Sequence, residues 1–227
     1  MGPLKQRQYA DRPPWNLCPS LRRSITFFEM LHLQNPKRVV QFNQTRPVAL
    51  IASDAQAEPG VLPTGGYLLD MPATGKRTGA YLTFHQDTLD LWGYRQAKLE
   101  EGGNPIALCE GAMVPIALYT EASKLKHCDV LWFVDNTSAL HSMIKGSARS
   151  EWLDRSVALF HFLAFHHDVH VWFEFVDSES NWSDGISRDL GEDKWAKQHG
   201  FALRELSIPL HLWKGPLHDV WENIMRE

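Results

Sequence analysis

Two short runs of apolar residues, far apart along the chain, are each followed by an aspartate. The first runs from Pro47 to Ser53 and precedes Asp54, and the second runs from Val130 to Val134 and precedes Asp135. Short apolar runs between polar segments are typical of strands that are buried on both faces of a sheet. The pattern therefore predicts two central strands, each with a carboxylate at its end.

Shorter strands are predicted on either side of this pair. Residues 67–70 and 80–84 predict two strands joined by a turn at Thr74–Lys76, and with the first strand they form an antiparallel meander. Pro63–Gly66 is predicted to be a turn because of its proline and glycines. Alternation of apolar and polar residues over 169–175 predicts the last strand.

Helical spacing fills the intervals between the strands. A helix over 106–125 would carry Glu110 and be capped by Asn104, and Pro115 within it predicts a bend or a later start. Asn136 and Ser150 are predicted caps of the next two helices. Helical patterns at the two ends of the chain predict a helix over 20–33 and two short helices in 191–227, separated by Pro209.

This order of elements predicts an α/β fold with a mixed sheet, in which the first, fourth and fifth strands are parallel. We expect three parts: a basic leader or connection over 1–46, an α/β domain over 47–190, and a helical extension over 191–227. The leader has eight basic and two acidic side chains, which gives it a formal charge of +6. Because the net charge of the whole chain is −4, the remaining residues carry −10. An acidic body argues against nucleic-acid binding by bulk charge alone.

Composition indicates the cellular compartment in which the protein is expected. The 227 residues include three cysteines, too few for a disulfide framework. No run reaches the roughly 18 apolar residues that a membrane span needs, and the polar start does not resemble a secretion signal. We therefore expect no membrane association and an intracellular location, in the cytoplasm or the nucleus.

The two strand-ending aspartates predict a metal site. Neighbouring parallel strands bring their carboxyl ends to one edge, so Asp54 and Asp135 are expected to lie close together. Carboxylates at that distance repel each other unless divalent cations lie between them, and hard oxygen ligands favour Mg²⁺ or Mn²⁺. Glu110 and Asp184 would complete the group, although any one aspartate after a strand is often only a turn residue. A second, weaker candidate is zinc binding by His166 and His170, which have the spacing of a helical pair.

Four motifs resemble ribonuclease H domains. They are Ser53-Asp54-Ala55 after a strand, Cys109-Glu110 on a helix, Phe133–Leu140 around Asp135, and Asn181–Arg188 around Asp184. The last is similar to the closing motif of ribonuclease H domains in retroelement reverse transcriptases, in particular the tyrosine-recombinase-type and related elements. The resemblance covers about residues 47–190, and it implies a five-stranded mixed sheet with helices on both faces.

The resemblance also implies a function. It is the metal-dependent hydrolysis of the RNA strand of RNA–DNA hybrids, with two Mg²⁺ or Mn²⁺ ions held by Asp54, Glu110, Asp135 and Asp184. Asn136, Ser138 and Arg188 would contact the substrate, and a polymerase domain would accompany the domain in the full-length chain. The loop before Asp184 lacks the histidine of many cellular members, and no basic protrusion is found.

Two other functions remain open from the sequence. One is another nuclease of the same fold, such as a transposase, a junction resolvase or a proofreading exonuclease. The other is a non-catalytic platform that binds nucleic acid or protein.

Overall fold

The computed structural model describes residues 45–94 and 105–226, together with Arg22, Ile25, Thr26, Phe28, Glu29 and His32. The chain divides into two compact units, one of Arg46–Leu210 and the other of Met1–Thr45 with His211–Glu227. All predicted site residues fall in the first unit. Most of the leader predicted over 1–46, including most of the helix predicted over 20–33, and the cap Asn104 lie outside the described residues.

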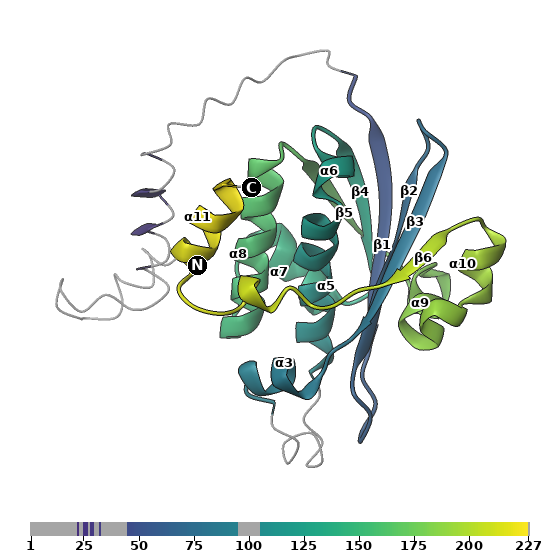
Figure 1. Ribbon diagram of the computed structural model, residues 1–227, viewed down its shortest axis with the longest axis horizontal. Helices are drawn as coiled ribbons and strands as arrows, with labels where there is room; N and C mark the ends of the chain where they lie inside the picture. Colours follow the sequence, from purple (N-terminus) through teal and green to yellow (C-terminus); the bar gives the residue numbers. More distant parts are fainter. Residues whose placement is uncertain are drawn as a thin grey trace. The chain divides into compact units, whose positions relative to one another are not determined.

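A six-stranded mixed sheet forms the centre of the larger unit (Figure 1). Its strands lie in the order β5-β4-β1-β2-β3-β6, with β1/β4, β4/β5 and β3/β6 parallel and β1/β2 and β2/β3 antiparallel. The strands are β1 Val48–Gln56, β2 Thr64–Met71, β3 Lys76–Thr83, β4 Asp129–Val134, β5 His170–Phe175 and β6 Ala202–Glu205. The predicted meander and the parallel arrangement of the first, fourth and fifth strands are thus confirmed.

The sixth strand corrects the expectation of five. β6 pairs in parallel with β3, with Ala202 opposite Thr78. It lies in the segment for which only helices were predicted. The strand was missed because four residues are too few to show the alternation of a strand. Pairing with the existing edge of a sheet also easily overrides the intrinsic propensity of so short a segment. Helices in this segment are α10, Lys194–Gln198, and, in the other unit, α11, Leu217–Arg226.

Helices cover both faces of the sheet. Figure 1 shows α5, α7 and α8 on one face and α9 and α10 on the other. The helices not yet delimited are α3 Gln86–Leu91, α5 Ile106–Thr120, α6 Ala122–Leu125, α7 Thr137–Lys145, α8 Glu151–His166 and α9 Asp184–Asp189, with 3₁₀ turns η1 Ser178–Ser180, η2 Leu190–Glu192 and η3 Leu210–Leu212. No helix was predicted at α3 or over the residues of α9. In the described part of the chain, no helix combines the length and the apolar character needed to cross a membrane.

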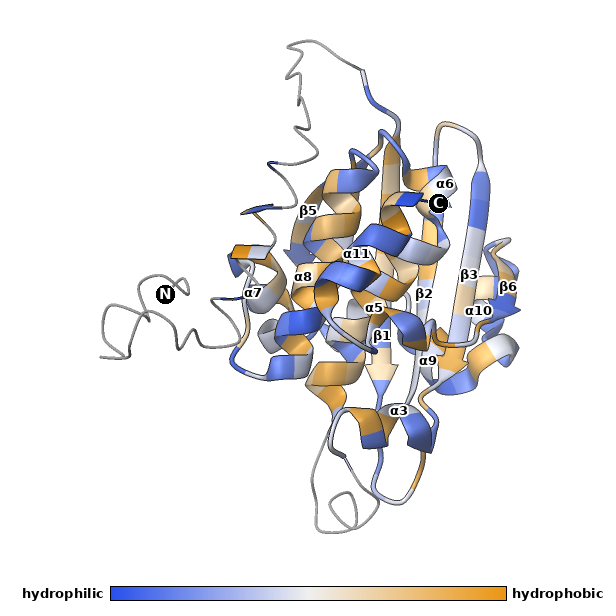
Figure 2. Ribbon diagram, turned by 60° about the vertical axis from the view of Figure 1, so that its left-hand side comes forward, coloured by the Kyte–Doolittle hydropathy of each residue, from blue (hydrophilic) through white to orange (hydrophobic). Residues whose placement is uncertain are grey.

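α5 is the centre of the core. Its residues from Leu108 to Leu118 are all buried, which is typical of a helix enclosed by packing on every side, and Figure 2 colours much of its ribbon as hydrophobic. The helix begins at Ile106, not later, and continues through Pro115, so tertiary packing offsets the roughly 3 kcal/mol that an interior proline costs. It ends at Thr120, earlier than predicted, and α6 follows as a separate turn.

A buried carboxylate connects the added strand to the rest of the sheet. Glu121, between α5 and α6, is 1% exposed, and it accepts a hydrogen bond from the Tyr67 hydroxyl of β2 at 2.7 Å. Arg204 of β6 lies 2.9 Å from the same carboxylate, and the Lys124 ammonium lies 2.5 Å from it. Burial, followed by the charge of Glu121, raises the pKa of Tyr67. The tyrosine therefore stays protonated and donates to Glu121.

Glu121→Ala is expected to lower the free energy of unfolding by about 2–3 kcal/mol, because the Tyr67 hydroxyl then stays buried without an acceptor and a charge network is broken. Tyr67→Phe should cost about 1 kcal/mol, since it removes only one bond. Urea denaturation followed by circular dichroism measures both. Glu192→Ala, at an exposed ion pair, is the control and should leave the midpoint unchanged.

Candidate metal centre

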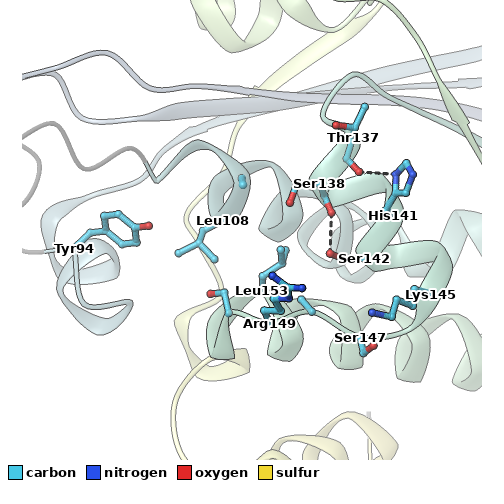
Figure 3. Close-up of a pocket in the computed structure, with 13 residues that line it drawn as sticks. Tyr94, Leu108, Thr137, Ser138, His141, Ser142, Lys145, Ser147, Arg149 and Leu153 are labelled. Atoms are coloured by element: carbon cyan, nitrogen blue, oxygen red, sulfur yellow. Dashed lines mark hydrogen bonds between the residues drawn. The ribbon is translucent and has the colours of Figure 1, made fainter. Parts of the chain in front are cut away.

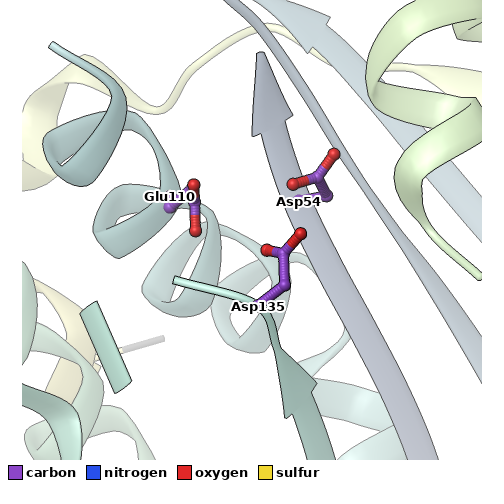
Figure 4. A group of neighbouring side chains, drawn as sticks. All are labelled: Asp54, Glu110 and Asp135. Atoms are coloured by element: carbon purple, nitrogen blue, oxygen red, sulfur yellow. The ribbon is translucent and has the colours of Figure 1, made fainter. Parts of the chain in front are cut away.

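Three carboxylates from different parts of the chain meet at one edge of the sheet. Asp54 of β1, Glu110 of α5 and Asp135, directly after β4, each place an oxygen within 4.8 Å of the others (Figure 4). Asp54 is 5% exposed and Glu110 is 6% exposed, while Asp135 is half-buried. The acidic cluster is defined here as these three residues.

The register of the two central strands brings the aspartates together. Ala52 of β1 pairs with Phe133 of β4. Asp54 lies two residues after Ala52, and Asp135 lies two residues after Phe133. One detail of the prediction is wrong: Asp54 is not at the end of its strand. β1 continues to Gln56, and Asp54 pairs with Gly66 of β2. The position of the aspartate is thus fixed by the pairing of β1 with β2, which continues for two residues after it.

Gly65 and Gly66 were predicted to be a turn, and the structure places them in β2 beside Asp54. A side chain at Gly65 would lie 2.8 Å from the Met113 sulfur of α5, and one at Gly66 would lie 2.8 Å from Ile186 of α9. The two glycines therefore let one helix approach each face of the sheet at this point. This close approach brings the helices that carry Glu110 and Asp184 next to Asp54.

Ser187 of α9 positions Asp54, and sequence reasoning assigned it no role. Its hydroxyl is fully buried and donates to Oδ2 of Asp54. Its carbonyl oxygen accepts a hydrogen bond of 2.5 Å from the Thr64 hydroxyl of β2, which fixes the helix to the strand. The only sequence signal was its place between Ile186 and Arg188 in the closing motif.

Asn136 orients Glu110 and caps α7 at the same time. Its side-chain Nδ2 donates to Oε1 of Glu110 at 3.2 Å. Its Oδ1 accepts the backbone N–H groups of Ser138 at 2.9 Å and Ala139 at 3.1 Å, as an N-cap residue does. The predicted cap is therefore confirmed, whereas the predicted contact of Asn136 with substrate stays a prediction.

The fourth predicted carboxylate lies near the cluster but engages a different partner. Asp184 begins α9, and both of its oxygens lie 2.9 Å from Nε of Arg188, one helical turn later. The Asp184 charge still acts on Asp54, since it is one of the causes that raise the Asp54 pKa. The structure thus brings three of the four predicted residues together, whereas Asp184 stays outside the acidic cluster and is paired with Arg188.

The closing motif shapes the loop before α9. Oδ1 of Asn181 accepts hydrogen bonds from the backbone and the hydroxyl of Ser183, at 3.1 and 2.7 Å. Trp182 packs its ring against Phe133 and Phe201, with centroids 6.4 and 5.7 Å apart. These contacts hold in place the loop that leads into Asp184 and α9.

Burial and mutual repulsion keep protons on the cluster. Burial is the main cause that raises the pKa of Glu110 to about 9, followed by the charges of Asp135 and Asp54. Burial also raises the pKa of Asp54 to about 7; the Ser187 bond opposes the rise, and the charges of Asp135 and Asp184 add to it. Both carboxyl groups are therefore poised to exchange a proton for a cation.

The donor set fits Mg²⁺ or Mn²⁺. Oε2 of Glu110 and Oδ1 of Asp135 are buried and accept no hydrogen bond, although buried oxygens are normally satisfied. Oxygen-only ligands match the preference of these hard cations. The unsatisfied oxygens therefore point to a divalent cation as their natural partner.

The weaker zinc candidates, His166 and His170, do not form a helical pair. His166 ends α8 and His170 begins β5, so the two residues do not share a helix face. Nδ1 of His170 lies 3.1 Å from Oδ1 of Asp129, and His166 stacks on Phe162. Within the described residues, the acidic cluster is the one group of three or more potential ligands whose atoms meet.

A groove of about 560 Å³ lies among α5, α7 and α8, and residues next in sequence to two cluster members line it (Figure 3). Ala107 and Leu108 of α5 are three and two residues before Glu110, and Thr137 and Ser138 of α7 are two and three residues after Asp135. The other lining residues are Tyr94, His141, Ser142, Lys145, Ser147, Ala148, Arg149, Ser150 and Leu153. The lining thus contains two basic side chains, a histidine and six hydroxyl groups, and no acidic side chain.

No protein-family model matches this chain, and no curated protein does. Two solved structures are similar to it at low identity. RNase H1 from the halophilic archaeon Halobacterium salinarum is 13% identical, with a TM-score of 0.45 over 63% of this chain and 98% of that one. The N-terminal RNase H domain of rv2228c from Mycobacterium tuberculosis, solved as a fusion with maltose-binding protein, is 14% identical, with a TM-score of 0.48 over 67% of this chain and 98% of that one. The chain's own strand order gives the predicted ribonuclease H-like α/β fold, extended by β6.

The raised pKa values predict how stability depends on pH. Asp54 and Glu110 ionise near pH 3.8 and 4.5 ordinarily, and near 7 and 9 in the folded chain, so the folded state binds more protons between these limits. Stability therefore falls as the pH rises through this window. In EDTA, we expect the melting temperature to drop by several degrees between about pH 5 and about pH 9.

The matched variant is Asp54→Asn with Glu110→Gln, which should show a smaller drop over the same range. Mg²⁺ should raise the melting temperature of the natural chain more at about pH 8 than at about pH 5, because cations and protons compete for the cluster. Equal pH profiles for the chain and the double variant would contradict the assigned protonation.

Proposed function

We propose that this chain is a metal-dependent nuclease that hydrolyses the RNA strand of RNA–DNA hybrids. The observation that carries the proposal is the acidic cluster, in which two buried carboxylates and one half-buried carboxylate lie within 4.8 Å of one another. Two of their oxygens accept no hydrogen bond, so the arrangement is costly unless it binds cations. The cluster lies on the fold that the sequence motifs predicted, at the positions of those motifs.

Asp54, Glu110 and Asp135 would hold the divalent cations, with Asp184 as the fourth ligand. Bound cations of this kind lower the pKa of water and stabilise the charge that develops at a phosphate. Asp54, fixed by Ser187, would be a ligand already held in position before a cation binds. Asn136 would keep Glu110 in place while its own amide remains bonded, and Ser138, exposed at the start of α7, would reach the sugar edge of the substrate. The 2′-hydroxyl of that sugar would distinguish RNA from DNA.

The groove among α5, α7 and α8 supports an anionic, extended substrate. Lys145 and Arg149 are exposed there among hydroxyl groups, which together suit phosphate oxygens. This local positive lining contrasts with the −10 balance of the chain after residue 46. The contact of Arg188 with a substrate phosphate remains part of the proposal, and it requires release from Asp184.

The setting is also part of the proposal. The chain would act in a retroelement reverse transcriptase, inside the cell, with residues 1–46 as the connection to a polymerase domain. The nuclease itself would occupy residues 47–190, followed by the extension over 191–227. The closing motif Asn181–Arg188 supports this context.

Asp54→Asn is expected to reduce cleavage of a labelled RNA–DNA hybrid in Mg²⁺ to background, since it removes a ligand of the cluster while keeping the shape of the side chain. Asp90→Asn, at an exposed aspartate of α3, is the control and should cleave like the natural chain. Circular dichroism checks that both fold. Cleavage by Asp54→Asn at the natural rate would remove the basis for the site.

The same assay with other substrates tests the type of nuclease. Hybrid should be cut in its RNA strand, while duplex DNA and single strands should remain intact. Cutting of duplex DNA would indicate another nuclease of this fold. Absence of cleavage together with absence of Mg²⁺ or Mn²⁺ binding would indicate a non-catalytic platform.

Lys145→Gln with Arg149→Gln is expected to raise the KM for hybrid roughly tenfold and to leave kcat within about twofold, because the groove contributes binding and not chemistry. The slope of log KM against log salt concentration should decrease by the amount that corresponds to about two lost phosphate contacts. Lys76→Gln with Lys194→Gln removes two exposed charges elsewhere and serves as the control. A similar salt dependence for all three proteins would contradict the role of the groove.

A further inference from the structure

Two neighbouring residues of α9 each engage a carboxylate of the site. Ser187 donates its hydroxyl to Oδ2 of Asp54. Arg188 donates from Nε to Oδ1 and Oδ2 of Asp184, both at 2.9 Å. One turn of a short helix thus controls two of the four predicted metal ligands.

The two contacts differ in what they leave available. Asp54 still has an oxygen within 4.8 Å of Glu110 and Asp135, so Ser187 fixes it without removing it from the cluster. Asp184 directs both oxygens to a guanidinium N–H and has no place in the cluster. A carboxylate in that state presents its charge to a cation only after it leaves the arginine.

We infer that Arg188 is a positioning residue that withholds Asp184 from the metal centre, so that the cluster takes up its first divalent cation without Asp184 and its second only by breaking the Arg188–Asp184 ion pair. The inference rests on the proposed function, because it concerns the same centre. It adds an order to cation binding and gives Arg188 a role that does not depend on substrate.

The ion pair is weak enough to be exchanged. The side chains of Arg188 and Asp184 are 56% and 32% exposed, and ion pairs at that exposure are screened by water and contribute little. In the cluster, Asp54 and Glu110 are buried and two oxygens, of Glu110 and Asp135, accept no hydrogen bond, so the cluster favours a cation more strongly than the partly exposed Asp184 does. Cation binding should therefore occur in two steps of different affinity.

Calorimetric titration with Mn²⁺, without nucleic acid, tests the inference. The natural chain should show a tight and a weaker step, and Asp184→Asn should lose the weaker one. Arg188→Gln should tighten the weaker step about two- to fivefold, the range that an exposed ion pair allows, and leave the first step unchanged. Arg188→Gln should have no effect in the Asp184→Asn background, as a double-mutant cycle requires for a direct interaction.

The controls separate this inference from the proposed function. Arg77→Gln breaks a similar exposed pair with Asp70 away from the site and should leave both steps unchanged. Equal tightening of both steps by Arg188→Gln would show a general charge effect and overturn the role of Arg188, as would an unchanged second step. If the natural chain binds no Mn²⁺ at all, the proposed function fails as well. Thermal melting of each variant confirms that it is folded.

Discussion

The repulsion among buried carboxylates is the constraint on which the rest of this structure depends. Asp54, Glu110 and Asp135 lie within 4.8 Å of one another, in surroundings that raise the pKa of Asp54 and Glu110 well above the usual range. Nothing in the core gains from such an arrangement, because burying charge costs free energy and like charges add to that cost. The arrangement is maintained by the surrounding elements and makes sense as a site for cations.

Two of the three carboxylates are held by different kinds of support. Pairing with Gly66 of β2 fixes Asp54, and Ser187 fixes the orientation of its carboxylate. The capping residue Asn136 fixes Glu110, so the start of α7 and the site share one side chain. Gly65 and Gly66 allow helices to approach both faces of the sheet at this point. The precision of the site therefore comes from rigid elements and not from loops.

Charge is distributed unevenly for a protein proposed to bind nucleic acid. The body is acidic, yet the groove among α5, α7 and α8 is lined by basic and hydroxyl side chains without an acidic one. Attraction would thus be local to this groove and would be weakened by salt. Most of the affinity for a hybrid would then be supplied by the cations and by other parts of a larger assembly.

The sequence by itself determined the central strands, the helix with Glu110, the cap at Asn136 and the identity of the candidate ligands, because apolar runs, capping residues and motifs are local signals. It did not determine that Asp54 lies inside its strand, that Gly65 and Gly66 belong to β2, or that Ala202–Glu205 adds a sixth strand. Only the tertiary structure decided that Ser187 bonds Asp54, since this contact depends on how closely α9 packs on the sheet. A pattern along the chain records which face a residue occupies, whereas the partner it meets there is fixed by distances between elements far apart in sequence.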